Sequence, residues 1–313
     1  MKLIPYGKLI LVQVLLLAAS VSTVSAQPLT RYPASLPPPL GKLPSEPASA
    51  TASVAPSAAG SCPTPSFEEQ VVEIVNQQRL ANGALAPLKQ ETLLDNSSET
   101  HSANMANRDF FAHCDPDTKT NPGARIQAAG YTWNSYGENI AAGYSTPASV
   151  MNGWMNSSGH RANILSTNFR ELGVGYFFQS NDAANVRTDN NGDCISDGNG
   201  TSGPFGHYWT QNFGRRSNVY PVIINREAIE TNSRNVQLYL YGDGWASEMR
   251  IQNAGGAWSN WQAFSSTLAW QLSSGNGIKT ISVELRSGAT VRSASDSICL
   301  NETYIYEDGF EDS

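Results

Sequence analysis

The spacing of apolar residues changes once along this chain, and that change limits the fold more than any other feature. From residue 66 to about residue 156, apolar side chains recur every three or four positions, which is the period of helices packed on a core. From residue 172 they alternate instead, which is the period of strands. Helices followed by strands around one shared core predict an α+β fold.

Four helices are expected in the first part of the chain. The first begins at a capping-box pattern, in which Ser66 and Glu69 stand three positions apart, and it ends at the Asn-Gly pair of 82–83. A short helix is expected at 123–129, and another begins near Pro147.

The remaining helix covers about residues 91–108 and carries the first histidine. Its inward stripe has the spacing of one helix face and consists of Leu94, Ser98, His101 and Met105. Because His101 shares that stripe with apolar residues, we expect a hydrogen-bonded core histidine there rather than a ligand.

The strand pattern has two parts. Two strands are expected at 172–178 and 207–213, separated by an excursion rich in Gly, Asn and Asp. After about residue 217, short strands alternate with turns, which predicts a small β-sandwich or barrel. The expected strands of this β region lie at 236–241, 249–252, 258–264, 268–272, 278–286 and 297–300.

The tryptophans of the β region have two interpretations. Trp245, Trp258 and Trp261 could stack on sugars, but such residues more often form the core of a small sandwich. We expect at least Trp270 in the core.

Composition divides the chain into segments. Residues 1–26 have the charged start, apolar centre and small-residue end of a secretory signal peptide. Residues 27–65 are rich in Pro, Ala and Ser, which predicts a disordered linker. The expected domains then cover 66–216 and 217–302, followed by an acidic tail at 303–313. These features predict a secreted, extracellular protein, with the periplasm as the alternative location.

Charge narrows the range of partners. The formal net charge is −7 and no run of basic residues occurs, which argues against nucleic acid or an anionic membrane surface as the main partner. The apolar run of the signal peptide is too short for a comfortable membrane span, so we expect no transmembrane segment in the mature chain. The sequence leaves the oligomeric state open.

The chain has four cysteines: Cys62, Cys114, Cys194 and Cys299. In an exported protein an even number predicts two disulfide bonds, with three pairings to choose from. We favour a bond from Cys114 to Cys62 or Cys194, and sequence does not decide between them. A disulfide is also a better interpretation of Cys114 than a thiol nucleophile beside His113.

Several short motifs, in a fixed order, resemble those of a known family. They are Asn76 with Arg79, His101-Ser102 with Met105, 111–113, 137–141, Trp154 with 158–161, 173–175 and 208–211. In this order they resemble the CAP superfamily of cysteine-rich secretory, antigen 5 and pathogenesis-related proteins, in its bacterial secreted form. The resemblance covers about 65–215 and implies an α-β-α sandwich with a central cleft. The β region is similar to small Ig-like modules.

The resemblance assigns cleft positions residue by residue. His113 matches the first cleft histidine of the family, Glu138 the first glutamate and His160 the second histidine. Ser157 stands where the second glutamate would be, so one carboxylate is missing. In eukaryotic relatives this cleft can hold a divalent metal, which makes zinc or another divalent ion the expected cofactor, with no organic cofactor.

The residues themselves allow two interpretations of this cleft. His113, His160 and Glu138 form a reasonable zinc set with water as the fourth ligand, although no HExxH spacing supports it. The alternative is a hydrogen-bonded His-Glu pair that orients loops. Glu138 is also expected to accept backbone N–H bonds in a tight loop between Gly137 and Asn139.

Three other patterns receive structural interpretations. Ser157 and Ser158 are too close to His160 in the chain to form a serine hydrolase pair, and no GxSxG motif exists. Residues 189–197 resemble a calcium loop but lack its Gly and final Glu, so a surface loop held by Cys194 is preferred. His207 is expected at the edge of the sheet.

These observations predict a secreted CAP-domain protein that binds a divalent metal and an apolar ligand or a surface partner, without demonstrated catalysis. One alternative is a metal-assisted hydrolase of peptide or cell-wall material, with Glu138 and His160 as its catalytic candidates. The other is a structural or adhesion protein.

Overall fold

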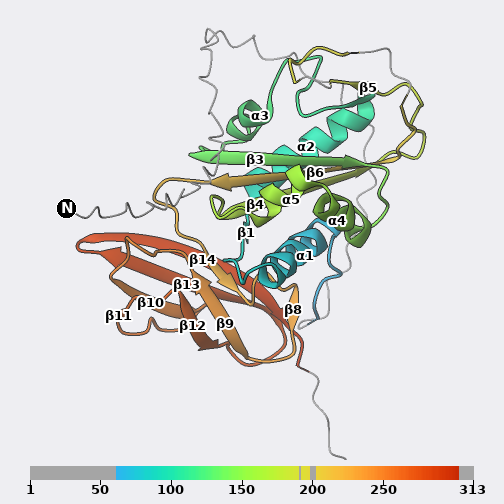
Figure 1. Ribbon diagram of the computed structural model, residues 1–313. Helices are drawn as coiled ribbons and strands as arrows, with labels where there is room; N and C mark the ends of the chain where they lie inside the picture. The colour runs from blue at the N-terminus through green and yellow to red at the C-terminus, as the bar shows by residue number, and fades with distance from the viewer. Residues whose placement is uncertain (1–60, 190–191, 198–201, 303–313) are drawn as a thin grey trace, which may run out of the picture. The chain divides into compact units, whose positions relative to one another are not determined.

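The structure is a computed structural model that describes residues 61–189, 192–197 and 202–302 (Figure 1). The predicted signal peptide, most of the predicted linker and the acidic tail lie outside these residues. Among the described helices, none has the length and apolar character needed to cross a membrane.

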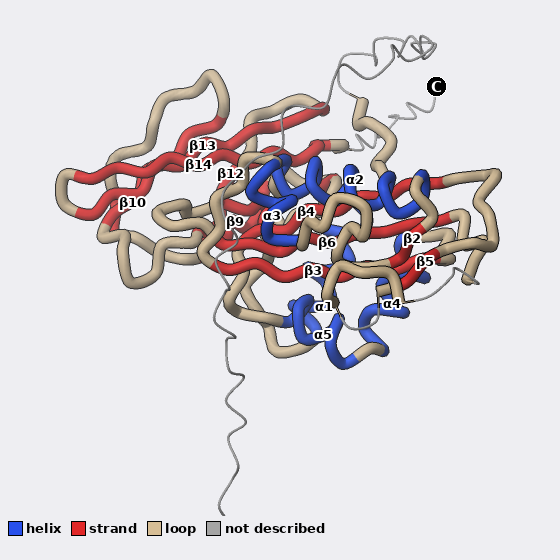
Figure 2. The backbone as a smooth tube through the Cα atoms, turned by 90° about the horizontal axis from the view of Figure 1, so that it is seen from above, coloured by secondary structure: helices blue, strands red, loops and turns tan. Residues whose placement is uncertain are grey.

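The first part of the chain is a four-stranded sheet covered by helices on both faces, which confirms the α+β class (Figure 2). The strand order is β1-β4-β6-β3, with β6 antiparallel to both of its neighbours. Helices α2 and α3 lie on one face, and α1, α4 and α5 lie on the other. The strands are β1 (Lys89–Gln90), β3 (Ser135–Ala142), β4 (Glu171–Phe178) and β6 (His207–Arg215). The helices are α1 (Phe67–Ala81), α2 (Thr92–Asn107), α3 (Pro122–Ala128), α4 (Pro147–Asn156) and α5 (Ser158–Leu165).

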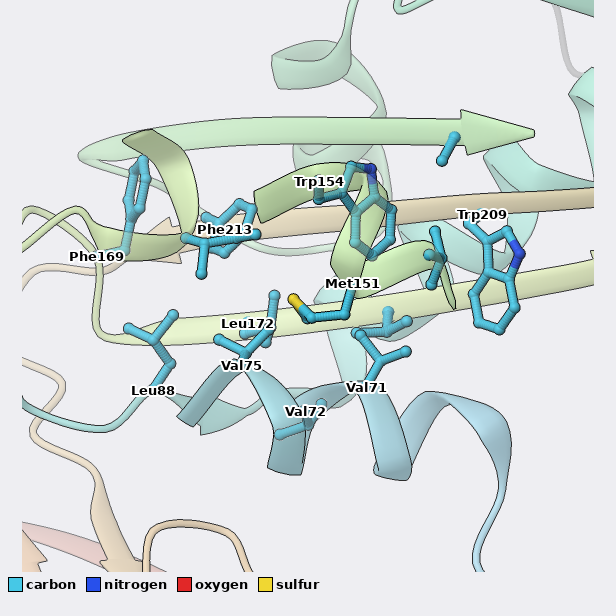
Figure 3. Packing of buried hydrophobic residues seen from close by; sticks show 14 residues of the cluster. Val71, Val72, Val75, Leu88, Met151, Trp154, Phe169, Leu172, Trp209 and Phe213 are labelled. Atoms are coloured by element: carbon cyan, nitrogen blue, oxygen red, sulfur yellow. The ribbon is translucent and has the colours of Figure 1, made fainter. Parts of the chain in front are cut away.

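The core of this sandwich lies between the sheet and α1. Val71 and Val75 of α1 point toward Met151 and Trp154 of α4 (Figure 3), and all four side chains are buried. The Trp154 indole donates a hydrogen bond to the carbonyl of Ile140 on β3 at 3.2 Å, which fixes α4 against the sheet. The helices predicted from the three- and four-residue spacing are therefore confirmed.

Two buried polar residues of α1 explain the first motif. Asn76 accepts a hydrogen bond from the Leu88 amide at 2.7 Å and donates one to the Leu88 carbonyl at 2.9 Å. Arg79 donates to the carbonyls of Ala86, Ile164 and Ser166. These side chains satisfy backbone groups of loops that have no strand partner, so they act as internal braces.

Helix α2 lies unusually close to β4, because two glycines leave room for it. A Cβ atom added to Gly173 would lie 2.1 Å from the carbonyl carbon of Leu94, and one added to Gly175 would lie 2.1 Å from the Glu99 nitrogen. Ser102 of α2 donates a hydrogen bond to the Gly175 carbonyl at 2.9 Å. The Gly-Val-Gly motif is thus a packing requirement of the sheet.

The second part of the chain is a β-sandwich, as expected, and its likeness to Ig modules stays a prediction. A five-stranded sheet of order β11-β10-β13-β14-β8 and a three-stranded sheet of order β12-β9-β7 share one apolar core. The first sheet contains β8 (Glu230–Thr231), β10 (Glu248–Asn253), β11 (Gln262–Ala263), β13 (Gly277–Ser287) and β14 (Thr290–Leu300). The second contains β7 (Val222–Ile224), β9 (Asn235–Leu240) and β12 (Thr267–Gln271).

The tryptophans of this sandwich divide into two groups. Trp245 and Trp270 pack against its core while staying partly exposed. Trp258 and Trp261 do not join that core, so the expectation is wrong for them. The Arg250 guanidinium lies 4.8 Å from the centroid of each of their rings. A strand was expected at 258–264, but only the two residues of β11 form one. Trp258 and Trp261 therefore do not lie on a strand that faces the core.

Buried charges join the sandwich to the CAP-like part. Lys89 Nζ lies 2.9 Å from Glu227 Oε1 and 2.7 Å from Asp296 Oδ1. The Tyr241 hydroxyl donates a hydrogen bond to the Pro87 carbonyl at 2.9 Å. These contacts are largely shielded from water, so they hold residues from both parts in a defined arrangement.

The four cysteines form two disulfide bonds, Cys62–Cys299 and Cys114–Cys194. The bond from Cys114 to Cys194 confirms one of the two partners expected for Cys114, and the other, Cys62, is wrong. The Cα atom of Cys62 lies instead 5.7 Å from that of Cys299, because β14 ends beside the start of the described chain.

The segment between the long strands β4 and β6 contains the surface loop expected around Cys194. Asp189 accepts hydrogen bonds from the amides of Gly192 and Cys194, which hold this loop in place. Small parallel strands β2 (Phe110–Phe111) and β5 (Arg187–Thr188) hold the same region.

Candidate functional site

Glu138 lies in the middle of β3, where its backbone pairs with Asn212 of β6. Its carboxylate is buried, with one oxygen 2.9 Å from His113 Nδ1 and the other 2.7 Å from Arg125 Nη2. The expectation of a tight loop with backbone N–H donors is therefore wrong. The sequence pattern did not predict β3 as a strand, because the polar residues of β3 face helices and loops instead of solvent.

The charges around Glu138 keep it ionised. Burial alone would raise the pKa of this carboxyl, but the charge of Arg125, together with the hydrogen bond from His113, outweighs burial and leaves the pKa below its usual value. An ionised carboxylate only accepts hydrogen bonds, so His113 Nδ1 carries the proton in their contact. The side chain of His113 is half exposed, which leaves its far edge open to solvent. The predicted His-Glu pair is thus present.

Arg125 was not predicted, and it changes what this cluster can bind. It comes from α3 and its side chain is only 8% exposed. Its Nη1 donates to the Thr120 carbonyl at 2.9 Å, which aims Nη2 at Glu138. No local pattern signals this role, because thirteen residues and a turn separate the two partners.

The described residues do not fit a resident divalent metal. Both oxygens of Glu138 already accept charged or polar hydrogen bonds, and a guanidinium occupies one of the directions from which a cation would approach. In the described part of the chain, no three His, Cys, Asp or Glu side chains are grouped as metal ligands. Metal binding at His113, His160 and Glu138 therefore stays a prediction that this geometry disfavours.

His160 lies on α5, a helix that the sequence did not reveal. Burial, and secondarily the nearby charge of His113, lower its pKa, so the imidazole is neutral at pH 7. The His160 carbonyl accepts a hydrogen bond from Asn139 Nδ2 at 3.1 Å. Ser157 ends α4 and begins α5 without a capping bond from its hydroxyl. No side-chain hydrogen bond joins His160 to Ser157 or Ser158 in the described structure.

A chain of amides fixes these elements to one another. Asn163 of α5 donates hydrogen bonds to the Glu138 carbonyl at 3.2 Å and to Asn139 Oδ1 at 2.9 Å. Asn139 Nδ2 also lies 3.1 Å from Gln211 Oε1 on β6. No sequence pattern indicated Asn163, because its role depends on the fold bringing α5 over β3.

An apolar groove opens beside His160. Its volume is about 300 Å³, and His160 and Ser157 line it, whereas the ion-paired Glu138 does not. The remaining side chains in its wall are mostly apolar: Phe111, Ile140, Ala141, Ala142, Tyr144, Trp154 and Phe205, with Gly153 beside them. The polar groups thus stand at one part of a largely hydrophobic surface, which is typical of small-molecule pockets.

The other two histidines lie away from the groove lining. His101 is fully buried on α2, and its Nε2 lies 3.0 Å from the Ala112 carbonyl. Burial lowers the pKa of His101 to about 4, and the core interpretation is confirmed. His207 begins β6, where its Nδ1 lies 2.8 Å from the Tyr176 hydroxyl. Because β6 lies between β4 and β3, the expectation that His207 lies at the edge of the sheet is wrong.

The first part of the chain is similar to known proteins. Residues 72–213 match the family described as CAP, the cysteine-rich secretory protein family. The uncharacterized protein YkwD of Bacillus subtilis (strain 168) is 41% identical over 110 residues, which are 35% of this chain and 42% of YkwD. The uncharacterized membrane protein YlbC of the same organism is 30% identical over 108 residues, 34% of this chain and 31% of YlbC. The chain thus spans less than half the length of these curated relatives.

Solved structures with partial likeness include two bacterial proteins. An extracellular protein containing a SCP domain from Bacillus anthracis str. Ames has 28% identity and a TM-score of 0.37, covering 48% of this chain and 40% of that one. An outer surface protein from Borrelia burgdorferi has 16% identity and a TM-score of 0.37, covering 50% of this chain and 100% of that one. The match of residues 72–213 and the identity with YkwD make this part of the chain similar to the CAP domains of the cysteine-rich secretory protein family.

Proposed function

We propose that this protein is exported and that its CAP domain binds a small ligand with an apolar body and one polar end. The apolar groove beside His160 carries the proposal. The two disulfide bonds support export, because such bonds persist in oxidising compartments. Catalysis is not part of the proposal.

The lining of the groove sets the class of ligand. A volume of about 300 Å³ stands at the lower end of the range for small-molecule pockets, so a short chain or a single ring system fits it. Phe111, Tyr144 and Phe205 supply aromatic surface. The Ser157 hydroxyl and the neutral imidazole of His160 can each donate or accept one hydrogen bond, so an alcohol or a carboxylic acid suits the polar end.

The rival activities have less support. A metal-assisted hydrolase needs a bound metal beside the reacting group, and here Arg125 takes that side of Glu138. A purely structural role accounts for the Glu138 cluster and the amide chain, but it gives no reason for an open apolar groove. A contact with an extracellular surface partner stays a prediction.

Binding of medium-chain probes tests the proposal. Octanoate and 1-octanol would be titrated into the protein and followed by calorimetry and by NMR shifts. Ser157→Trp fills the groove at a position whose hydroxyl makes no capping bond, and Ser158→Trp, on the exposed neighbouring residue, is the matched control. We expect Ser157→Trp to weaken binding at least about tenfold, equal to about 1.4 kcal/mol, and the control to bind like wild type. No binding by wild type, or equal loss in both variants, contradicts the proposal.

Metal analysis addresses the competing prediction. Purified protein would be dialysed against zinc and its content compared between wild type, His113→Ala and His160→Ala. We expect no stoichiometric zinc in any of the three, because the Glu138 carboxylate is already paired. One zinc per chain in wild type that both substitutions remove would restore the metal site.

A further inference from the structure

A second pocket lies where the CAP sheet ends and the chain passes toward the β-sandwich. Its volume is about 470 Å³, and three arginines contribute to its wall: Arg170, Arg215 and Arg216. The other lining residues are Asn, Ser and Tyr. Among the described residues, no carboxylate lines this pocket, although the chain as a whole carries a net charge of −7. The local charge is therefore opposite to that of the protein.

The charge of Arg216 is balanced by two carboxylates that do not line the pocket. Its guanidinium forms a close ion pair with the buried Glu171 and lies 3.4 Å from Glu91. It also lies over the ring of Tyr131, at 4.8 Å from the centroid. Arg216 thus shapes the wall without adding net charge to it.

Arg170 presents a guanidinium that is held in place and not neutralised. It lies over the rings of Tyr220 and Tyr241, at 5.2 and 5.3 Å from their centroids. Its Nη1 donates one hydrogen bond to the Val219 carbonyl at 3.0 Å. A guanidinium has five N–H donors, so this one is oriented in advance and keeps donors for a ligand.

Arg215 supplies the second charge. It ends β6 with an exposed side chain, and no hydrogen bond or ion pair engages its guanidinium in the described structure. Burial, followed by the nearby positive charge of Arg215, lowers the pKa of Arg170. Two like charges therefore share one pocket without an anion between them, and a bound anion would relieve their repulsion.

We propose that this pocket binds the dianionic phosphate group of a phosphomonoester. Two guanidinium groups carry the charge of about 2 that balances a phosphomonoester at neutral pH, and each can contact two of its oxygens. The amides of Asn134, Asn168 and Asn218 offer further donors around the same space. A phosphate fills only part of about 470 Å³, which leaves room for a glycerol- or sugar-sized remainder. The site is distinct from the groove beside His160 and does not depend on the function proposed for it.

Four small anions test the chemistry. Inorganic phosphate, glycerol 3-phosphate, dimethyl phosphate and acetate would each be titrated into the full chain at pH 7.5 and low salt, followed by calorimetry. We expect the first two to bind, with glycerol 3-phosphate the tighter, and the two monoanions to bind at least about tenfold more weakly. Equal affinity for acetate and phosphate would overturn the assignment of a dianion. Preference for dimethyl phosphate would point to a phosphodiester polymer and would overturn the monoester.

Charge-matched variants test the location. Arg215→Gln removes an exposed charge from the pocket, and Arg292→Gln removes an exposed charge from β14, outside it. We expect Arg215→Gln to weaken phosphate binding at least about tenfold and Arg292→Gln to leave it unchanged, with both variants melting like wild type. Phosphate binding that survives Arg215→Gln, or that is absent from wild type up to about 10 mM, overturns the proposal.

Discussion

Arg125 and Glu138 form a buried ion pair, with 2.7 Å between Nη2 and Oε2 and side chains that are 8% and 2% exposed. A buried pair of this kind costs much desolvation, so the loss of one member is more harmful than the loss of both charges. His113 adds a hydrogen bond to the same carboxylate but is half exposed, so it stabilises the buried carboxylate less than Arg125 does.

Removing the arginine alone is therefore expected to damage the fold. Arg125→Met leaves an unpaired carboxylate at Glu138 and should lower the free energy of unfolding by about 3–5 kcal/mol in urea titrations. Adding Glu138→Gln, which removes the charge but keeps an oxygen for His113, should recover more than half of that loss. The control, Arg187→Met, breaks the exposed pair with Asp117 and should cost about 1 kcal/mol or less. Equal losses at the two arginines would mean that the buried pair has no special weight.

The residues around Glu138 show which parts of this site could be predicted from the sequence. The motifs identified His113 and Glu138, and the expected contact between them is present. The sequence did not predict the roles of Arg125 and Asn163. Each residue lies on a helix that contacts β3 only in the folded protein, and neither forms a sequence pattern with its partner. A charged residue that enters the core through tertiary packing leaves no periodic signal.

The protonation of His101 makes a second prediction. Its pKa is about 4 in the folded protein and 6.5 as the ordinary value, so the folded protein holds this imidazole neutral. A lowered histidine pKa means that the unfolded chain binds the proton first. The stability due to His101 is therefore complete above pH 6.5 and is lost as pH falls toward 4, by about 3 kcal/mol in total.

Urea titrations at pH 7 and pH 4.5 would measure this effect. His101→Gln keeps an N–H donor for the Ala112 carbonyl but cannot take up a proton. The difference in unfolding free energy between wild type and variant should shift by about 2–3 kcal/mol between the two pH values, in favour of the variant at low pH. A difference that does not change with pH would show that His101 does not titrate in this way.

The close approach of α2 to β4 supplies a third prediction. Gly175→Ala places a methyl group 2.1 Å from the Glu99 nitrogen, so the helix must move away from the sheet. We expect a loss of about 3 kcal/mol or more, at the upper end of overpacking effects, with a lower melting temperature. Gly159→Ala on α5 is the control, since nothing lies within 4 Å of its added carbon, and alanine there should be neutral or stabilising by about 0.5–1 kcal/mol. Similar losses at both positions would remove the packing explanation.

The same physics separates the elements that sequence predicted from those it missed. Helices α1, α2 and α4 bury apolar stripes, so their period is visible. Strand β3 buries Glu138 and Asn139 among apolar residues, and α5 has Ile164 as its one fully buried residue, so neither shows a clear period. Two-residue strands such as β8 depend wholly on their neighbours and carry no signal of their own.

Lys89 is the centre of the last prediction, because it is the cation between two buried carboxylates. Glu227 and Asp296 have side chains that are 10% and 3% exposed, and Asp296 also accepts a hydrogen bond from the Ile224 amide at 2.6 Å. Burial, and then the charge of Asp296, raise the pKa of Glu227 even with Lys89 present. Lys89→Met should therefore leave two carboxyls that repel each other and resist ionisation.

The loss in Lys89→Met should depend on pH. With the cation gone, the folded pKa of Glu227 rises further, so the folded protein binds a proton more strongly than the unfolded chain and gains stability as pH falls. We expect Lys89→Met to cost about 3–5 kcal/mol in urea titrations at pH 8 and clearly less at pH 5. Lys279→Met, on β13, whose Nζ donates to the Ser274 carbonyl in an exposed setting, should cost less than about 1 kcal/mol at either pH. If the Lys89→Met deficit is the same at both pH values, Glu227 does not titrate in the folded variant, and Lys89 contributes through packing rather than as a counter-ion.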